Sequence, residues 1–174
     1  SDYDTLWTTY AGTWALDSIN AICSANGTIA VDVGLTDLYF STEMYWDASS
    51  GFRNRSQPKV RTGAYSSYND GLMIEAGATS GTNITRFDLK WNGSTVLSIS
   101  GSWDATAEYI MGEIWVSGSQ CQFAMNTVWS ATYGSLSDPT GRTYVGLWGS
   151  RFSTNAAFRY TKIYTLDGEL LNEI

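Results

Sequence analysis

Short segments that alternate apolar and polar residues, separated by turn residues, constrain the fold of this chain more than any other feature. In the segment 38–46, LYFSTEMYW, one face collects Leu38, Phe40 and Met44, while tyrosine and polar side chains fall on the other. Successive side chains of a β-strand point to opposite faces, so this pattern predicts a strand with one buried face. No segment of helical length shows a convincing 3.6-residue amphipathic period. The sequence therefore predicts an all-β fold with negligible helix.

Alternating segments recur along the whole chain. The strands that they predict are 13–17, 28–33, 38–46, 59–65, 71–77, 84–91, 95–101, 108–117, 121–129, 143–148 and 158–166. Asn92-Gly93 and Asp167-Gly168 each join two alternating arms, which is a strong local sign of a β-hairpin. Many short strands joined by tight turns favour an antiparallel two-sheet β-sandwich. The predicted core includes Phe40, Met44, Ile110, Ile114, Phe123, Val145 and Ile163.

Composition limits the possible functions. The chain has 174 residues, enough for one domain with a substantial core, and its net charge of −7 argues against a nucleic-acid partner. It contains no histidine, which removes a Ser-His-Asp triad, a Cys-His pair and a histidine-ligated metal. No stretch approaches the roughly 20 apolar residues of a membrane span, so no membrane insertion is expected. The residues themselves predict no cofactor.

The N-terminal segment SDYDTLWTTYAGTW is rich in aromatic residues, including Trp7, Tyr10 and Trp14, before the alternation becomes regular. An aromatic-rich terminus of this kind either adds an edge strand to its own sandwich or docks on a neighbouring molecule. Both alternatives are open for residues 1–12, and docking is slightly favoured.

Two predicted strands carry a glutamate between aromatic residues on the face opposite the core. On the segment 38–46 these side chains are Tyr39, Glu43 and Tyr45. On the segment 108–116, EYIMGEIWV, they are Tyr109, Glu113 and Trp115. Aromatic rings suit stacking on sugars, so these six residues are the candidate ligand-binding site. An ordinary solvated outer face is the alternative.

A small retaining glycan hydrolase is a third interpretation of the same face. Such an enzyme needs two carboxyl groups about 5–5.5 Å apart, and Glu43 and Glu113 are the candidates. The segments TEMYW and GEIW resemble strand motifs of jelly-roll glycanases. However, the chain is short for such an enzyme, and the signature E-x-D-x-x-E, with paired acids on one strand, is absent. No catalytic residue is therefore predicted, and the hydrolase is kept as the alternative.

Three further expectations concern single features. The basic segment 52–61, FRNRSQPKVR, is expected to be a solvated loop that leads into a strand, with anion binding as the alternative. Trp103, in the turn-like segment SGSWDATAE, is expected to be the most exposed tryptophan. Cys23 and Cys121 lie far apart in the chain and are expected to be free buried thiols, although a single disulfide is possible.

The C-terminal part of the chain resembles concanavalin A-like and laminin-G-like jelly-roll domains of bacteriophage structural proteins and bacterial surface proteins. The residues that carry the resemblance are Gly146 to Gly149, the loop 150–156, Lys162-Ile163-Tyr164 and Asp167-Gly168-Glu169-Leu170-Leu171. The segment 27–35, GTIAVDVGL, is similar to the early strand of such domains, which ends in an Asp-x-Gly step. The resemblance implies that residues 1–174 form a single concanavalin A-like jelly roll.

Domains of this kind are mostly non-catalytic. The resemblance therefore implies a binding or structural module of a virion or an extracellular surface, acting by adhesion, decoration or glycan binding. The implied partners are a glycan or surface polysaccharide, other copies of the chain, or virion and surface proteins. Many members bind calcium through acidic loop residues, but no Asp-x-Asp loop cluster is present here, so calcium is implied by the resemblance alone.

Overall fold

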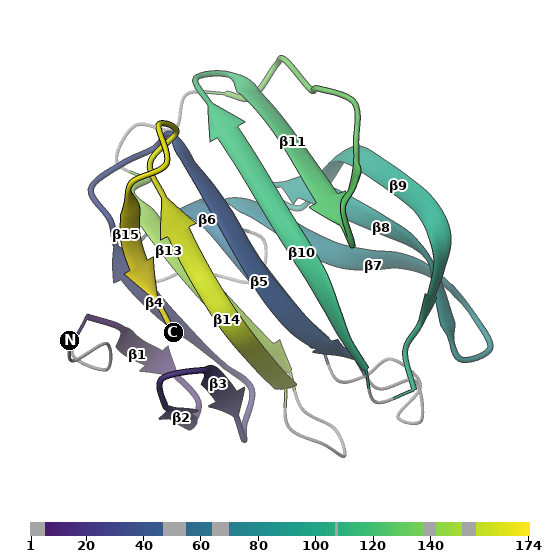
Figure 1. The fold of residues 1–174 in the computed structure, drawn as a ribbon, viewed down its shortest axis with the longest axis horizontal. Coiled ribbons are helices and arrows are strands. Elements are labelled where there is room, and N and C mark those ends of the chain that lie inside the picture. The colour runs from purple at the N-terminus through teal and green to yellow at the C-terminus, as the bar shows by residue number, and fades with distance from the viewer. Residues whose placement is uncertain (1–5, 47–54, 64–69, 107, 138–141, 151–155) are drawn as a thin grey trace.

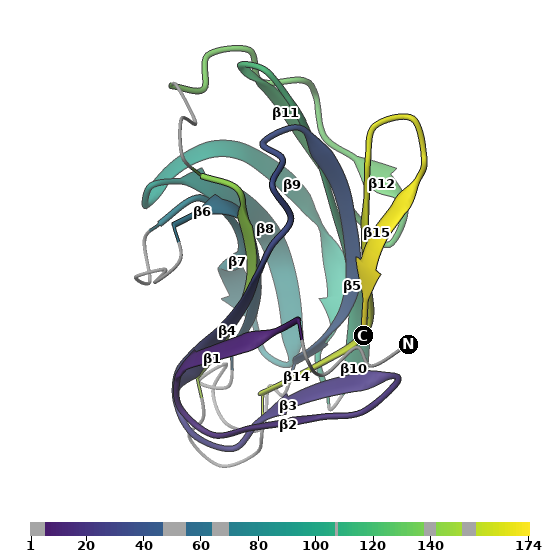
Figure 2. The same ribbon diagram turned by 90° about the vertical axis from the view of Figure 1, so that its left-hand side faces the viewer.

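The computed structural model describes residues 6–46, 55–63, 70–106, 108–137, 142–150 and 156–174. These residues form two antiparallel β-sheets and contain no helix, as the alternation predicts. Figure 2 shows the two sheets as separate layers seen nearly edge-on. The fold class predicted from the sequence, an antiparallel two-sheet β-sandwich, is confirmed.

Sheet A has seven strands. In spatial order they are β1 (Thr8–Ala11), β4 (Gly27–Asp32), β13 (Tyr144–Ser150), β6 (Arg55–Thr62), β7 (Leu72–Ser80), β8 (Asn83–Trp91) and β9 (Ser94–Asp104). Consecutive hairpins build the β6–β9 half, whereas β13 inserts between β4 and β6 from far along the chain.

Sheet B has eight strands. In spatial order they are β12 (Val128–Trp129), β11 (Gln120–Met125), β10 (Glu108–Ser117), β5 (Leu38–Trp46), β14 (Ala156–Tyr164), β3 (Asn20–Cys23) and β2 (Trp14–Leu16), with β15 (Leu170–Glu173) beside β14. Figure 1 shows β10, β5 and β14 running side by side. Strand β14 pairs with β5 along one edge and with β3 and then β15 along the other.

The core lies between the two sheets and consists of the apolar faces of their strands. All seven predicted core residues are buried, with at most 2% of their surface exposed. Strands β5 and β10 have the predicted bounds, because their alternation runs unbroken from end to end. Strand β3 was not predicted, and β1 was expected only as one of two alternatives for residues 1–12; both strands are only four residues long, which leaves little room for a period-2 pattern.

Both predicted hairpins are present. Asn92 and Gly93 have positive φ angles of 47° and 84° and connect β8 to β9, as a two-residue hairpin loop requires. Gly168 has a φ of 93° in the connection from β14 to β15. The predicted strand 121–129 is instead interrupted, because Asn126 and Thr127 both have positive φ and turn the chain back into β12. The sequence also predicts a turn at Asp138-Pro139, and this dipeptide lies outside the described residues.

The expectation that the basic segment 52–61 is a solvated loop is wrong where the structure describes it, although its last residues belong to a strand, as predicted. Residues 55–62 form β6, and the side chains of Lys59 and Arg61 are fully buried. Arg61 has a φ of 53° beside an irregularity in the β13–β6 register. Its guanidinium donates to the Thr36 carbonyl at 2.5 Å and the Gly118 carbonyl at 2.7 Å, and it pairs with Asp37 at 2.8 Å. The cation therefore ties sheet A to the turn after β10 instead of meeting solvent.

Trp103 is also buried, contrary to expectation, with 8% of its surface exposed. Its ring meets that of Phe87 edge-on at a centroid distance of 5.0 Å, inside the core. Strand β9 continues to Asp104, so the turn-like sequence around Trp103 forms the end of a strand. Gly101 makes this possible, because a Cβ there would lie 2.6 Å from the indole ring.

The thiols of Cys23 and Cys121 are free and buried, as predicted. Burial raises the pKa of Cys121 to about 11 and also raises that of Cys23, so both thiols stay protonated and unreactive at neutral pH.

The N-terminal segment packs against its own sandwich. The Trp7 indole N–H donates to Asn172 Oδ1 at 2.9 Å, and β1 pairs with β4 as an edge strand. The edge-strand alternative for the N-terminal segment is therefore present, and docking on a neighbour stays a prediction.

Candidate ligand-binding face

The six predicted site residues lie on the outer face of sheet B, which points away from the core. Strands β5 and β10 are adjacent and antiparallel, so Tyr39 is opposite Trp115 and Tyr45 is opposite Tyr109. Directly paired residues of an antiparallel sheet share a face, which brings the aromatic residues of the two strands together. Strand β14, on the other side of β5, places Tyr164 opposite Tyr39.

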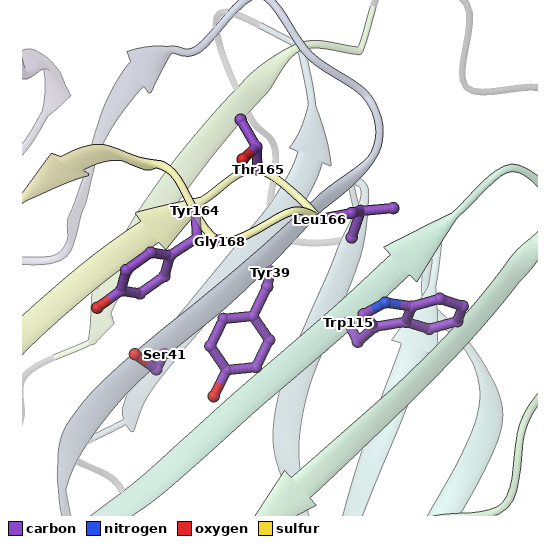
Figure 3. A pocket seen from close by; sticks show the side chains of 7 residues that line it. All are labelled: Tyr39, Ser41, Trp115, Tyr164, Thr165, Leu166 and Gly168. Atoms are coloured by element: carbon purple, nitrogen blue, oxygen red, sulfur yellow. The ribbon is translucent and has the colours of Figure 1, made fainter.

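One end of this face carries a pocket of about 430 Å³. It is lined by Tyr39, Ser41, Trp115, Tyr164, Thr165, Leu166 and Gly168. Figure 3 shows the side chains of Tyr164, Tyr39 and Trp115 arranged across three neighbouring strands, with Leu166 at the turn beyond them. The β14–β15 turn therefore forms one wall of a pocket whose floor is sheet B.

The Glu113 carboxylate is held at this end of the face. The phenol O–H of Tyr39 donates a hydrogen bond to Glu113 Oε1. Burial is the main cause of the raised pKa of Tyr39, and the bond to the Glu113 carboxylate raises it further. The phenol therefore remains protonated at physiological pH and acts as a fixed donor to Glu113. The Tyr39 ring also contacts that of Tyr164 at a centroid distance of 5.8 Å.

Glu43 occupies the other end of the face and pairs with Arg159 of β14. The Arg159 guanidinium lies 3.9 Å from the centroid of the Tyr109 ring, which in turn meets Tyr45 edge-on at 5.4 Å. The hydrogen bond to Glu43 raises the pKa of Arg159, so the cation is fixed in its charged form. Burial raises the pKa of Tyr109, with Arg159 acting in the opposite direction.

The six predicted residues thus divide into two groups on one face. Glu43 is opposite Met111 and lies diagonally from Glu113, a relation in which the two residues are about 7–8 Å apart and their Cβ atoms somewhat closer. Each carboxylate bonds to a different partner, Glu43 to Arg159 and Glu113 to Tyr39. Only Tyr39 and Trp115 of the six line the pocket.

Sequence reasoning missed the contribution of β14 and the turn that follows it. Tyr164 and Leu166 line the pocket, and Arg159 neutralises Glu43. The aromatic Tyr164 in a predicted strand could have been recognised from the sequence as a candidate ligand contact. Its position beside Tyr39 could not, because that position depends on which strands become neighbours.

A second polar surface, also missed, lies on the outer face of sheet A. Gln57 and Lys59 of β6 are fully buried there, and Lys59 Nζ is 6.0 Å from the centroid of the Trp148 ring. Lys90 pairs with Glu75 at 2.5 Å on the same face. In the described part of the chain, neither polar atom of the Gln57 amide has a hydrogen-bond partner. Burying an amide in this way costs stability.

No cluster of three or more acidic or cysteine side chains able to hold a metal ion occurs among the described residues. Those residues also include no helix of the length and apolarity that crossing a bilayer would require.

No protein-family model matches the sequence, and no curated protein matches it significantly. Solved structures do match the fold. A carbohydrate-binding module, CBM66, from Bacillus subtilis is 14% identical with a TM-score of 0.60, over 91% of this chain and 94% of that one. The exoplasmic/lumenal domain of VIP36, solved with Ca²⁺ and Man3GlcNAc bound, is 12% identical with a TM-score of 0.65, over 95% and 88%.

A protein of unknown function with a galectin-like fold, also from Bacillus subtilis, is 8% identical with a TM-score of 0.61, over 99% of this chain and 93% of that chain. At such low identities the likeness concerns the fold alone, and it extends over nearly the whole length of both partners. The jelly-roll architecture implied by the C-terminal segment is therefore correct. The chain has the β-sandwich fold of the galectin-like and concanavalin A-like lectins.

Proposed function

We propose that this protein is a non-enzymatic glycan-binding module that holds its ligand in the pocket on the outer face of sheet B. The observation that carries the proposal is the row of Tyr164, Tyr39 and Trp115 beside the hydroxyl of Ser41. Aromatic rings cover the apolar faces of a sugar, while hydroxyl and carboxylate groups bond to its hydroxyls. The carbohydrate-binding module and the glycan-bound VIP36 domain support the same class of ligand.

The test is a glycan array followed by titration against soluble β-glucans, xylans and bacterial polysaccharides. Trp115→Ala should weaken binding about tenfold or more, because it removes the largest ring of the pocket. Leu35→Ala is the matched control, since it removes a partly exposed apolar side chain that does not line the pocket. Unchanged binding by Trp115→Ala would rule out this pocket as the glycan site.

The absence of catalysis is part of the proposal. It is supported by the separate bonding of the two carboxylates, Glu43 in an ion pair with Arg159 and Glu113 in a hydrogen bond with Tyr39. A retaining hydrolase would use the pair together. Incubation with the same polysaccharides should release no reducing sugar. Release that both Glu43→Gln and Glu113→Gln abolish would establish the hydrolase instead.

The setting that we propose is a virion or an extracellular surface, where the module would sit beside other copies or other surface proteins. This rests on the resemblance of the C-terminal segment to domains of phage structural and bacterial surface proteins. Mass spectrometry of fractionated source material tests it, and the chain should be enriched in the virion or surface fraction. Enrichment with the soluble internal proteins would contradict it.

A further inference from the structure

The hairpin that joins β11 to β12 carries two exposed apolar side chains at the edge of sheet B. Trp129 is 45% exposed and Val128 is 54% exposed. The two turn residues, Asn126 and Thr127, have φ angles of 46° and 71°. A positive φ is unfavourable for the β-branched Thr127, so the turn persists because its surroundings hold it.

Strand β10 provides that support. The Met111 N–H donates to Asn126 Oδ1 at 2.9 Å, and the Asn126 N–H donates to the Met111 carbonyl at 3.0 Å. The turn is thus hydrogen-bonded to the same strand that carries Trp115. Strand β12 and the Trp129 side chain are therefore fixed in position relative to the pocket.

Trp129 lies on the same face as the pocket. Trp129 is opposite Ala124 of β11, and Ala124 is opposite Glu113 of β10. Glu113 is in turn opposite Ser41 of β5, which lines the pocket. Directly paired residues share a face, so Trp129 is on the outer face of sheet B. Val128, next to it, is opposite Met125 and belongs to the other face.

The aromatic residues on this face span a distance much longer than one sugar ring. Tyr164, Tyr39 and Trp115 occupy three adjacent strands in direct register, and Gln122 of β11 follows Trp115 in the same row. Trp129 is one strand further, in the neighbouring row, because it is opposite Ala124 and not Gln122. Neighbouring strands are about 4.8 Å apart, so the four steps from β14 to β12 cover roughly 19 Å.

We propose that Trp129 is a second contact for the bound glycan, and that the ligand is a neutral linear polysaccharide lying across the strands from the pocket to β12. The inference rests on the proposed function and specifies its ligand. A site for a terminal sugar needs only the pocket. An exposed tryptophan that is held rigidly farther along the same face is instead suited to contact internal sugar units of a polysaccharide.

The charge of the molecule favours a neutral polymer. The chain carries a net charge of −7, which disfavours a polyanion by long-range repulsion. On the outer face of sheet B, Arg159 is paired with Glu43, and Lys162, opposite Ser41, has the acidic Glu173 opposite it on its other side. Between the pocket and Trp129 lie the neutral Gln122 and Ala124 and the Glu113 carboxylate, which accepts a hydrogen bond from Tyr39 and adds to the repulsion of a polyanion.

The test is native gel electrophoresis in gels that contain mixed-linkage β-glucan, xylan, galactomannan or dextran, with four proteins side by side: wild type, Trp115→Ala, Trp129→Ala and Val128→Ala. In a gel that retards the wild type, Trp129→Ala should bind about tenfold more weakly while Val128→Ala migrates as wild type. Calorimetry with the disaccharide of that polymer should show affinities within twofold for wild type and Trp129→Ala, and a loss for Trp115→Ala.

The outcomes separate the two proposals. Two results would overturn the extended site and leave the pocket as the glycan site. In the first, binding depends on Trp115 but not on Trp129. In the second, the protein binds sugars on the array, but no polymer retards it in the gel. A shift in solution mass for Trp129→Ala with unchanged retardation assigns the β12 edge to contact between copies of the chain and also overturns it. The absence of binding to any glycan removes both proposals.

Discussion

Gly112 lies in the middle of β10, on the face that packs against the core, where it is opposite Thr42 of β5. A Cβ at this position would lie 2.4 Å from Met44 Cε and 3.2 Å from Ile74 Cδ1. These two side chains come from different sheets, so the missing Cβ is a condition for close packing at this point of the sandwich.

Gly112→Ala should lower the free energy of unfolding by about 1–3 kcal/mol, because one added methyl group overpacks the core. Gly134→Ala is the control, since no atom lies within 4 Å of a Cβ there, and its effect should be small. Urea denaturation of the two variants measures the difference. Equal stabilities would mean that Met44 moves aside without cost.

Lys59 is the second residue whose environment has a measurable consequence. Burial lowers its pKa to about 8, although the charge of Asp70 acts in the opposite direction. An unfolded lysine has a pKa of about 10.4. Between these two values the unfolded chain binds a proton that the folded chain does not, so stability should rise with pH across this window. Below pH 8 the full cost of burying the cation is present.

Lys59→Met removes the titrating group. The free energy of unfolding of the wild type, relative to this variant, should therefore increase by about 2 kcal/mol from pH 8 to pH 10. Urea denaturation at pH 7, 8, 9 and 10 measures both proteins. If the free energies of unfolding of the two proteins change in parallel with pH over this range, the pKa of Lys59 in the folded protein is close to its ordinary value.

At the scale of a single element, the β11–β12 hairpin combines backbone strain with the glycan contact that we propose for Trp129. Thr127 has a φ of 71°, a conformation that glycine adopts without penalty. Thr127→Gly should raise the free energy of unfolding by about 0.5–1 kcal/mol, the relief of strain being partly offset by the greater freedom of glycine in the unfolded chain.

Asn126→Ala should have the opposite effect, because it removes the acceptor of the Met111 N–H and leaves a positive φ. Thermal unfolding monitored by circular dichroism compares the two variants. If both variants lower the melting temperature equally, the prediction for Thr127→Gly is wrong, and the positive φ of Thr127 does not cost the folded protein stability.

At the scale of the whole molecule, the N-terminal segment connects the two ends of the chain. Strand β1 covers the edge of β4, and Trp7, which is buried, bonds to Asn172 of β15. Removal of residues 1–12 should therefore lower the melting temperature, because it exposes an edge strand and part of the core.

Light scattering of the truncated and full chains tests the docking role at the same time. A fall in molecular mass with the fold intact would favour docking on a neighbour. A monomer throughout, with a large loss of stability, would assign residues 1–12 to their own sandwich alone. No change in either quantity would exclude both roles.

The sequence by itself determined the fold class, the predicted core residues and the division of β5 and β10 into an inner and an outer face. Period-2 alternation is a local property, so nine residues such as 38–46 carry it completely. The Asn92-Gly93 and Asp167-Gly168 hairpins were also predictable, because a tight turn depends on the conformational freedom of its own residues, as the positive φ angles of Asn92, Gly93 and Gly168 show.

Only the tertiary structure decided which strands became neighbours. The pairing of β14 with β5 brings Arg159 to Glu43 and Tyr164 to Tyr39, across more than a hundred residues of sequence. Lys59 and Trp103 were misassigned for the same reason, since burial of a side chain depends on what packs above its strand. Alternation tells which side of a strand a residue faces, but strand order and packing are set by contacts between distant segments, which no local pattern encodes.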